Sequence, residues 1–108
     1  MTILSVLAEI LFVGHSLVGP NLPPLLEVGL IARGQTEARV RAQVINGAPL
    51  AWQWDHSAEA EGVDARVVLA TEDVDALVLT EAIPLADQVQ WNDSATQVAR
   101  FAALAWER

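Results

Sequence analysis

The sequence predicts an α/β fold in which helices cover both faces of a parallel sheet. Short apolar runs alternate with stretches of helical periodicity, and this strand–helix order occurs three times along the chain. Parallel neighbours require helical crossovers, which are right-handed and lie on the faces of the sheet. The 108 residues, 53% of them hydrophobic, suffice for one modest core. We therefore expect residues 1–108 to form one domain or part of one.

The first strand and helix are predicted from an apolar run and a helix start. Residues Ile10 to Val13 form a continuous apolar run that ends at Gly14, as is typical of a strand buried on both faces. Asn21 can cap a helix whose first turn tolerates two prolines, because the first amides of a helix have no intrahelical partner. Gly34 is expected to end this helix.

The second strand is predicted from strict alternation in "ARVRAQV", residues 38–44. Alanine and valine occupy one side, whereas Arg39, Arg41 and Gln43 occupy the other, which predicts a half-exposed strand at the edge of a sheet. A turn at Asn46 and Gly47 follows.

The third unit combines a short helix, an apolar strand and a final helix. The short helix is expected within residues 64–70, and "ALVLT", residues 76–80, predicts a strand with no polar side. Asn92 or Asp93 can cap a last helix that carries apolar residues at helical spacing. Together the elements predict a flavodoxin-like three-layer sandwich, limited to about three βα units with the strand order 2-1-3.

Composition excludes several function classes. Fourteen acidic residues against six arginines and no lysine give a formal charge of −8, which would repel a nucleic-acid backbone. Without cysteine there is no disulfide, thiolate nucleophile or cysteine metal site, and the compartment stays undecided. The segment "MTILSVLA", residues 1–8, is too short to span a bilayer and lacks the positive region of an intact signal peptide. It is a start-site remnant or an extra strand or helix turn.

No cofactor or metal site is predicted. The acidic residues on either side of the short helix have no accompanying histidine, and their spacing fits no calcium loop. They are interpreted as a solvated acidic face and comprise Asp64, Glu72, Asp73 and Asp75.

A serine lies where ligands gather in parallel sheets. Ser16 follows the carboxyl end of the first strand, and Gly14 permits a tight exit from that strand. The glycine turn after the second strand could bring the Gly47 amide to the same crevice. Both segments are equally compatible with ordinary βα turns.

Two segments resemble the SGNH (GDSL-type) hydrolases. "FVGHSLVGPNLPPLL", residues 12–26, resembles their first block, and "VINGAPL", residues 44–50, resembles the second. The resemblance implies the N-terminal part of a serine-dependent ester or acyl hydrolase domain that acts on a small ester or acylated substrate. Ser16 would be the nucleophile, and the amides of Ser16 and Gly47 would form the oxyanion hole.

Three departures from this family lead to an alternative function. His15 replaces the family's Asp beside the serine and is interpreted as a structural substitute. Thr80 or Glu81 stands where the third block supplies Asn, and a carboxylate would oppose an oxyanion unless it were protonated or turned away. The Asp-X-X-His block is absent from this chain. The alternative is a non-catalytic SGNH-like binding or interaction module.

Other aromatic and basic candidates follow the second block. His56, with Asp55 as neighbour, could complete a triad unlike that of the family, or it could decorate the surface. Trp52 and Trp54 are interpreted as core residues, with the wall of a substrate crevice as the alternative.

The third predicted strand also leads to an expectation about association. It is interior in a five-stranded sheet but an edge in this chain, and residues Ala76 to Thr80 contain no lysine, proline or inward charge to protect that edge. We expect the chain to self-associate, or to pair with a C-terminal half, through this strand.

Overall fold

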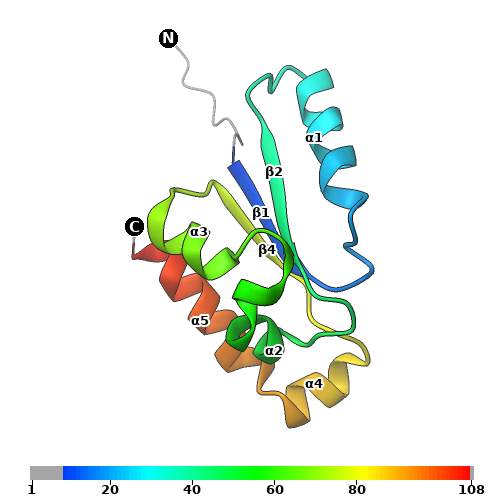
Figure 1. Cartoon of the computed structure of the whole chain (residues 1–108), viewed down its shortest axis with the longest axis vertical. Helices are drawn as coiled ribbons and strands as arrows, with labels where there is room; N and C mark the ends of the chain where they lie inside the picture. Colours follow the sequence, from blue (N-terminus) through cyan, green and yellow to red (C-terminus); the bar gives the residue numbers. More distant parts are fainter. Residues whose placement is uncertain (1–8, 108) are drawn as a thin grey trace.

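The computed structural model describes residues 9–107, which form an α/β fold around a four-stranded sheet (Figure 1). The expectations for residues 1–8 lie outside the described residues. The strands are β1 (Glu9–Gly14), β2 (Arg39–Val44), β3 (Glu61–Gly62) and β4 (Ala76–Leu79), in the order β3-β2-β1-β4.

The sheet is mixed, so the prediction of a purely parallel sheet was wrong. β1 pairs in parallel with β2 on one side and with β4 on the other. The two-residue β3 adds an antiparallel pairing to the end of β2, through Gln43 and Val44. Gly62 permits this close approach because its φ is +84° and a Cβ atom there would overlap the carbonyl oxygen of Ala42.

Three helices lie where the sequence predicts them, and two short helices were not predicted. The helices are α1 (Leu22–Ala32), α2 (Leu50–Asp55), α3 (Ala65–Thr71), α4 (Leu85–Trp91) and α5 (Ser94–Trp106), with a 3-10 turn η1 (Ser57–Glu59) after α2. The helices that the sequence pattern missed are α2 and α4, of six and seven residues. Fewer than two full turns cannot display helical periodicity.

The predicted helices start at the predicted positions, but only one of their N-caps forms a side-chain hydrogen bond. Asn21 stands at the N-cap of α1, which has proline in its first turn, and its side chain makes no cap hydrogen bond. The Asp64 carboxylate caps α3 by accepting hydrogen bonds from the N–H groups of Arg66 and Val67. Asp93 stands at the predicted cap of α5 with a left-handed backbone, φ 52°, but its side chain makes no cap hydrogen bond. The position was therefore predicted correctly, although the bond does not form.

The larger core lies between the sheet and the helices α2, α3 and α5. Its centre is fully buried and consists of Leu11, Val13, Leu50, Ala65, Val68, Leu69 and Phe101. The Trp54 ring packs edge-on against Phe101, with centroids 5.0 Å apart, so this tryptophan lies at the border of the core.

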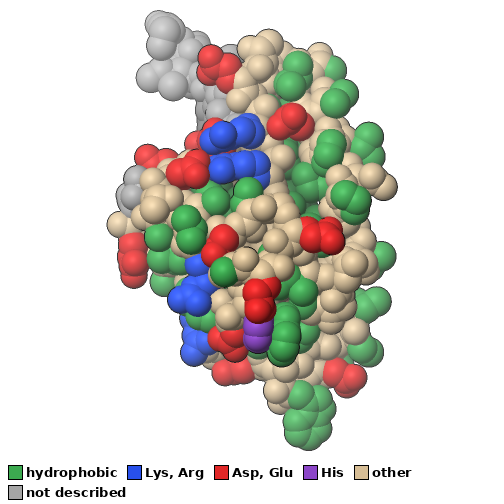
Figure 2. Space-filling view, viewed as in Figure 1, with side chains coloured by type: hydrophobic (Ala, Val, Ile, Leu, Met, Phe, Trp, Pro, Cys, Tyr) green, Lys and Arg blue, Asp and Glu red, His purple; other side chains and the backbone are tan. Residues whose placement is uncertain are grey.

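The opposite face of the sheet is covered by α1. A smaller core forms there from Ile10, Phe12, Val18, Val40 and Val44. Helix α1 keeps much apolar surface in contact with solvent, and Leu25 is 68% and Val28 65% exposed. Figure 2 shows apolar side chains along the border that α1 forms and again at the end of the molecule formed by α4.

The side of β2 predicted to be solvent-facing divides into a charged and a buried part. Arg39 and Arg41 form ion pairs with Glu9 and Glu72, and Figure 2 shows basic side chains bordered by acidic ones in this region. The hydrogen bond and charge of Glu9 raise the pKa of Arg39. Gln43, by contrast, is fully buried. The prediction that it faces solvent was wrong because α2 and α3 cover that end of the strand.

Candidate functional site

The candidate site lies where β1 and β2 end, at the lower end of the sheet in Figure 1. Gly14 is the register partner of Val44, and the Ile45 N–H donates a hydrogen bond to the Gly14 carbonyl at 3.2 Å. Ser16 follows Gly14 by two residues, and Gly47 follows Val44 by three. The two turns that carry the predicted site residues therefore follow the carboxyl ends of two adjacent strands.

The Ser16 turn is tight and leaves its serine accessible. The His15 carbonyl accepts hydrogen bonds from the N–H groups of Val18 and Gly19, at 3.0 and 3.1 Å. Gly14 is required because a Cβ atom there would overlap the Val18 side chain. Ser16 is exposed, and neither its Oγ nor its N–H forms a hydrogen bond among residues 9–107.

His15 is buried and both of its ring nitrogens are engaged. Nδ1 accepts the Leu17 N–H at 3.2 Å, so this nitrogen carries no proton. Nε2 then carries the proton and donates it to the Glu81 carbonyl at 3.0 Å. The ring holds the Ser16 turn against the segment after β4, and no lone pair remains to accept a proton from Ser16.

Thr80 and Glu81 follow the carboxyl end of β4, at the same end of the sheet as the Ser16 turn. The Thr80 N–H donates to the Val13 carbonyl at 2.9 Å. The Glu81 carboxylate is turned toward two helix starts: Oε1 accepts the Leu50 N–H of α2 at 2.8 Å, and Oε2 accepts the Ser94 hydroxyl of α5 at 2.6 Å. Glu81 Oε1 also accepts the Ala82 N–H. This carboxylate therefore joins α2, α5 and the end of β4.

The Gly47 turn borders an open pocket of about 380 Å³. Residues 45–49 and Trp52 line it, and Gly47 has a φ of +70°. The Gly47 N–H forms no hydrogen bond among the described residues. Trp52 is 50% exposed, so the interpretation of this ring as a core residue was wrong, and it lies in the pocket wall instead.

His56 packs against Trp52. Its ring stacks on Trp52 with centroids 3.5 Å apart, and its Nδ1 lies 3.2 Å from the Trp52 carbonyl oxygen. Within residues 9–107, no hydrogen bond joins His56 or Asp55 to Ser16. The alternative triad that uses His56 finds no support in this arrangement.

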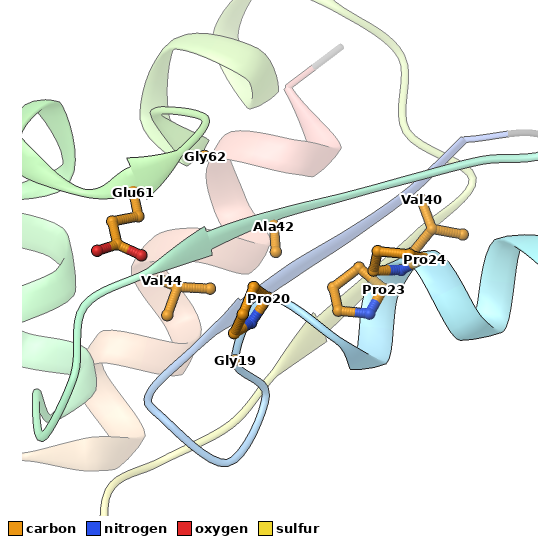
Figure 3. A pocket seen from close by; sticks show the side chains of 9 residues that line it. All are labelled: Gly19, Pro20, Pro23, Pro24, Val40, Ala42, Val44, Glu61 and Gly62. Carbon is orange, nitrogen blue, oxygen red and sulfur yellow. The ribbon is translucent and has the colours of Figure 1, made fainter.

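A second, more apolar pocket lies beside the Ser16 turn on the α1 face (Figure 3). Its volume is about 250 Å³. Val40, Ala42 and Val44 of β2 line one side, and prolines at the start of α1 line the other. The pocket shares Gly19 with the Ser16 turn and can take only a small apolar group.

Sequence reasoning missed two glutamines that support the site. Gln53 is fully buried, and its Nε2 donates to the Gly14 carbonyl at 2.6 Å and lies 3.5 Å from the Ile45 carbonyl. Gln43 Nε2 donates to Gln53 Oε1 at 2.8 Å, and Gln43 Oε1 accepts the Ala65 N–H. The signal was the spacing of Leu50 and Gln53, which places both on one face of a helix.

The described residues contain no group of three or more side chains that could hold a metal ion. None of the helices between residues 9 and 107 has the length and apolar character that crossing a membrane requires. Comparisons with family models, curated proteins and solved structures give no match for this chain. The geometry of the strand ends is therefore the basis on which a function can be assigned.

Proposed function

We propose that this chain carries the nucleophile and part of the oxyanion hole of an SGNH-type ester or acyl hydrolase. One observation carries the proposal. Two turns on adjacent strand ends leave the Ser16 hydroxyl, the Ser16 N–H and the Gly47 N–H without hydrogen-bond partners among the described residues. Acyl transfer requires a hydroxyl and two free amides around one point, and these two turns carry all three groups.

In the proposed reaction, Ser16 Oγ attacks the acyl carbon and its proton passes to a general base. The negative charge that develops on the carbonyl oxygen would be stabilised by the two amides. Neither histidine among the described residues is arranged to be the base, because His15 uses both nitrogens and His56 stacks on Trp52. We propose that the base comes from an Asp-X-X-His block on further polypeptide.

Glu81 favours a second candidate function, that of a non-catalytic binding module. This residue stands where the resemblance expects an Asn amide, and its carboxylate instead accepts hydrogen bonds from Leu50 and Ser94. The third oxyanion donor is thereby missing. The apolar pocket of Figure 3 would then be the binding site, and its ligand would be a small apolar group.

A fluorophosphonate probe distinguishes the two functions. Added imidazole can stand in for the missing base and should accelerate phosphonylation of Ser16, as mapped by peptide mass spectrometry. The Ser16→Ala variant should lose the adduct, whereas Ser57→Ala, which changes a buried serine, should keep it. Labelling of folded protein that does not exceed labelling of urea-unfolded protein would leave the binding module as the function.

A further inference from the structure

The outer edge of β4 carries backbone groups without a strand partner. β4 pairs with β1, and no strand within residues 9–107 pairs with its other side. The Thr80 N–H donates to the Val13 carbonyl on β1 at 2.9 Å, and Val13 is in register with Leu79. Because the amides of a parallel strand alternate in direction, Val78 and Ala76 likewise point toward β1, and the N–H and C=O groups of Leu77 and Leu79 point away from it. An added strand can supply partners for these outward groups.

Charge does not protect this edge. Residues Ala76–Leu79 contain no charged side chain and no proline. The nearest acids are turned inward: Asp75 Oδ2 accepts the Glu9 N–H at 2.9 Å, and Glu81 bonds the starts of α2 and α5.

The strand is complementary to a second copy of itself. Leu77 and Leu79 face the α5 side of the sheet, whereas Ala76 packs on the α1 side. In an antiparallel pair about a two-fold axis, opposite residues must lie on the same face of the joined sheet. An axis at Leu77 satisfies this and places Ala76 opposite Val78 of the second copy. It also places Asp75 opposite Leu79 of the second copy, whereas an axis at Val78 would place Asp75 opposite Glu81.

We propose that two copies of this chain associate through antiparallel pairing of their β4 strands, with the two-fold axis at Leu77. Leu77 of each copy exchanges N–H and C=O hydrogen bonds with Leu77 of the other, and Ala76 faces Val78 of the other copy in a non-hydrogen-bonded pair. The two sheets thereby become one continuous sheet. The pairing depends only on β4 and is independent of whether Ser16 is a nucleophile.

Sedimentation velocity of the purified chain over a dilution series is the first test. We expect a dimer at micromolar concentration. Leu77→Pro removes an outward N–H without removing a bond to β1 and should weaken association about tenfold or more, because the hydrogen bond that each copy donates to the other is lost. Leu77→Ile keeps the N–H and the side-chain volume and should leave association unchanged. A wild-type monomer at low micromolar concentration would overturn the proposal, as would a dimer that Leu77→Pro leaves intact.

Disulfide trapping tests the register and stays informative if the proline variant unfolds. The chain contains no cysteine, so Ala76→Cys and Val78→Cys each introduce a single thiol. With the axis at Leu77, residue 76 of one copy faces residue 78 of the other in a non-hydrogen-bonded pair, where Cβ atoms are close enough for a disulfide. Mild oxidation of a mixture of the two variants should give a covalent dimer, and the control Leu25→Cys on exposed α1 should give little. Efficient trapping through Leu25→Cys alone would contradict the pairing and indicate association through α1.

Discussion

Replacement of Gln43 by leucine tests the buried amide network beneath the candidate site. Gln43 is fully buried, and its Nε2 donates to the Gln53 carbonyl at 3.0 Å and to Gln53 Oε1 at 2.8 Å. Its Oε1 accepts the Ala65 N–H at 2.8 Å, at the first residue of α3. Gln43→Leu has a similar volume but no polar atom, so Gln53 Oε1 and the Ala65 N–H lose the partners they have in this structure.

The expected loss follows from these two unsatisfied groups. Each buried donor or acceptor left without a partner costs roughly 1–3 kcal/mol. Burial of the leucine side chain offsets part of this cost, so we expect a net loss of about 3 kcal/mol in the free energy of unfolding. That is a large share of the roughly 5–15 kcal/mol typical of a domain.

Urea unfolding followed by tryptophan fluorescence, at fixed protein concentration, measures this loss. The midpoint should fall while the m-value stays constant. The control Gln90→Leu, on an exposed position of α4, should change the unfolding free energy by less than about 0.5 kcal/mol. The double variant Gln43→Leu with Gln53→Leu should cost less than the sum of the single changes. A loss below about 1 kcal/mol for Gln43→Leu would refute the network's role.

Three further predictions concern glycines, the Glu81 carboxylate and turnover. Gly62→Ala should lower the free energy of unfolding by roughly 1–3 kcal/mol because Gly62 has a positive φ and a Cβ atom there would overlap Ala42, whereas Gly29→Ala, in open surroundings, should raise it by about 0.4–1 kcal/mol. Thermal unfolding that ranks the two variants in the opposite order would contradict this. Glu81→Ala should lower the free energy of unfolding in urea by roughly 2–4 kcal/mol because the N–H of buried Leu50 loses its acceptor, and Glu81→Gln should lower it clearly less because the amide oxygen can still accept. Equal losses for the two variants would contradict the capping role of Glu81. The chain without added base should hydrolyse p-nitrophenyl acetate no faster than its Ser16→Ala variant, since an unassisted serine hydroxyl is a weak nucleophile.

The predictable part of the fold is the part whose signals are local. β1 was predictable because its apolar run is unbroken, and α1 because a cap and two prolines mark its start. β3 was not predictable, since two residues carry no periodicity and their pairing depends on the Gly62 backbone. Gln43 was placed on the wrong side because alternation identifies the two faces of a strand but does not show that a distant helix covers one of them.

In the candidate site, too, some features follow from local sequence signals and others depend on distant contacts. The position of Ser16 after β1 and the glycine turn after β2 could be predicted, because they depend on spacing from the ends of strands. The roles of His15 and Glu81 depend on contacts with residues far away in the sequence. His15 bonds the carbonyl of a residue 66 positions later, and the Glu81 carboxylate bonds an amide 31 positions earlier. No local pattern encodes such contacts.

The central claim is that the Ser16 and Gly47 amides converge on one point beside Ser16 Oγ. Titration of ¹⁵N-labelled protein with methylboronic acid tests this directly, because a boronate ester on the serine carries a tetrahedral oxyanion. We expect the amide protons of Ser16 and Gly47 to move downfield together in the wild-type chain and neither to move in Ser16→Ala. A shift at only one of the two amides, or equal shifts in the Ser16→Ala variant, would contradict it.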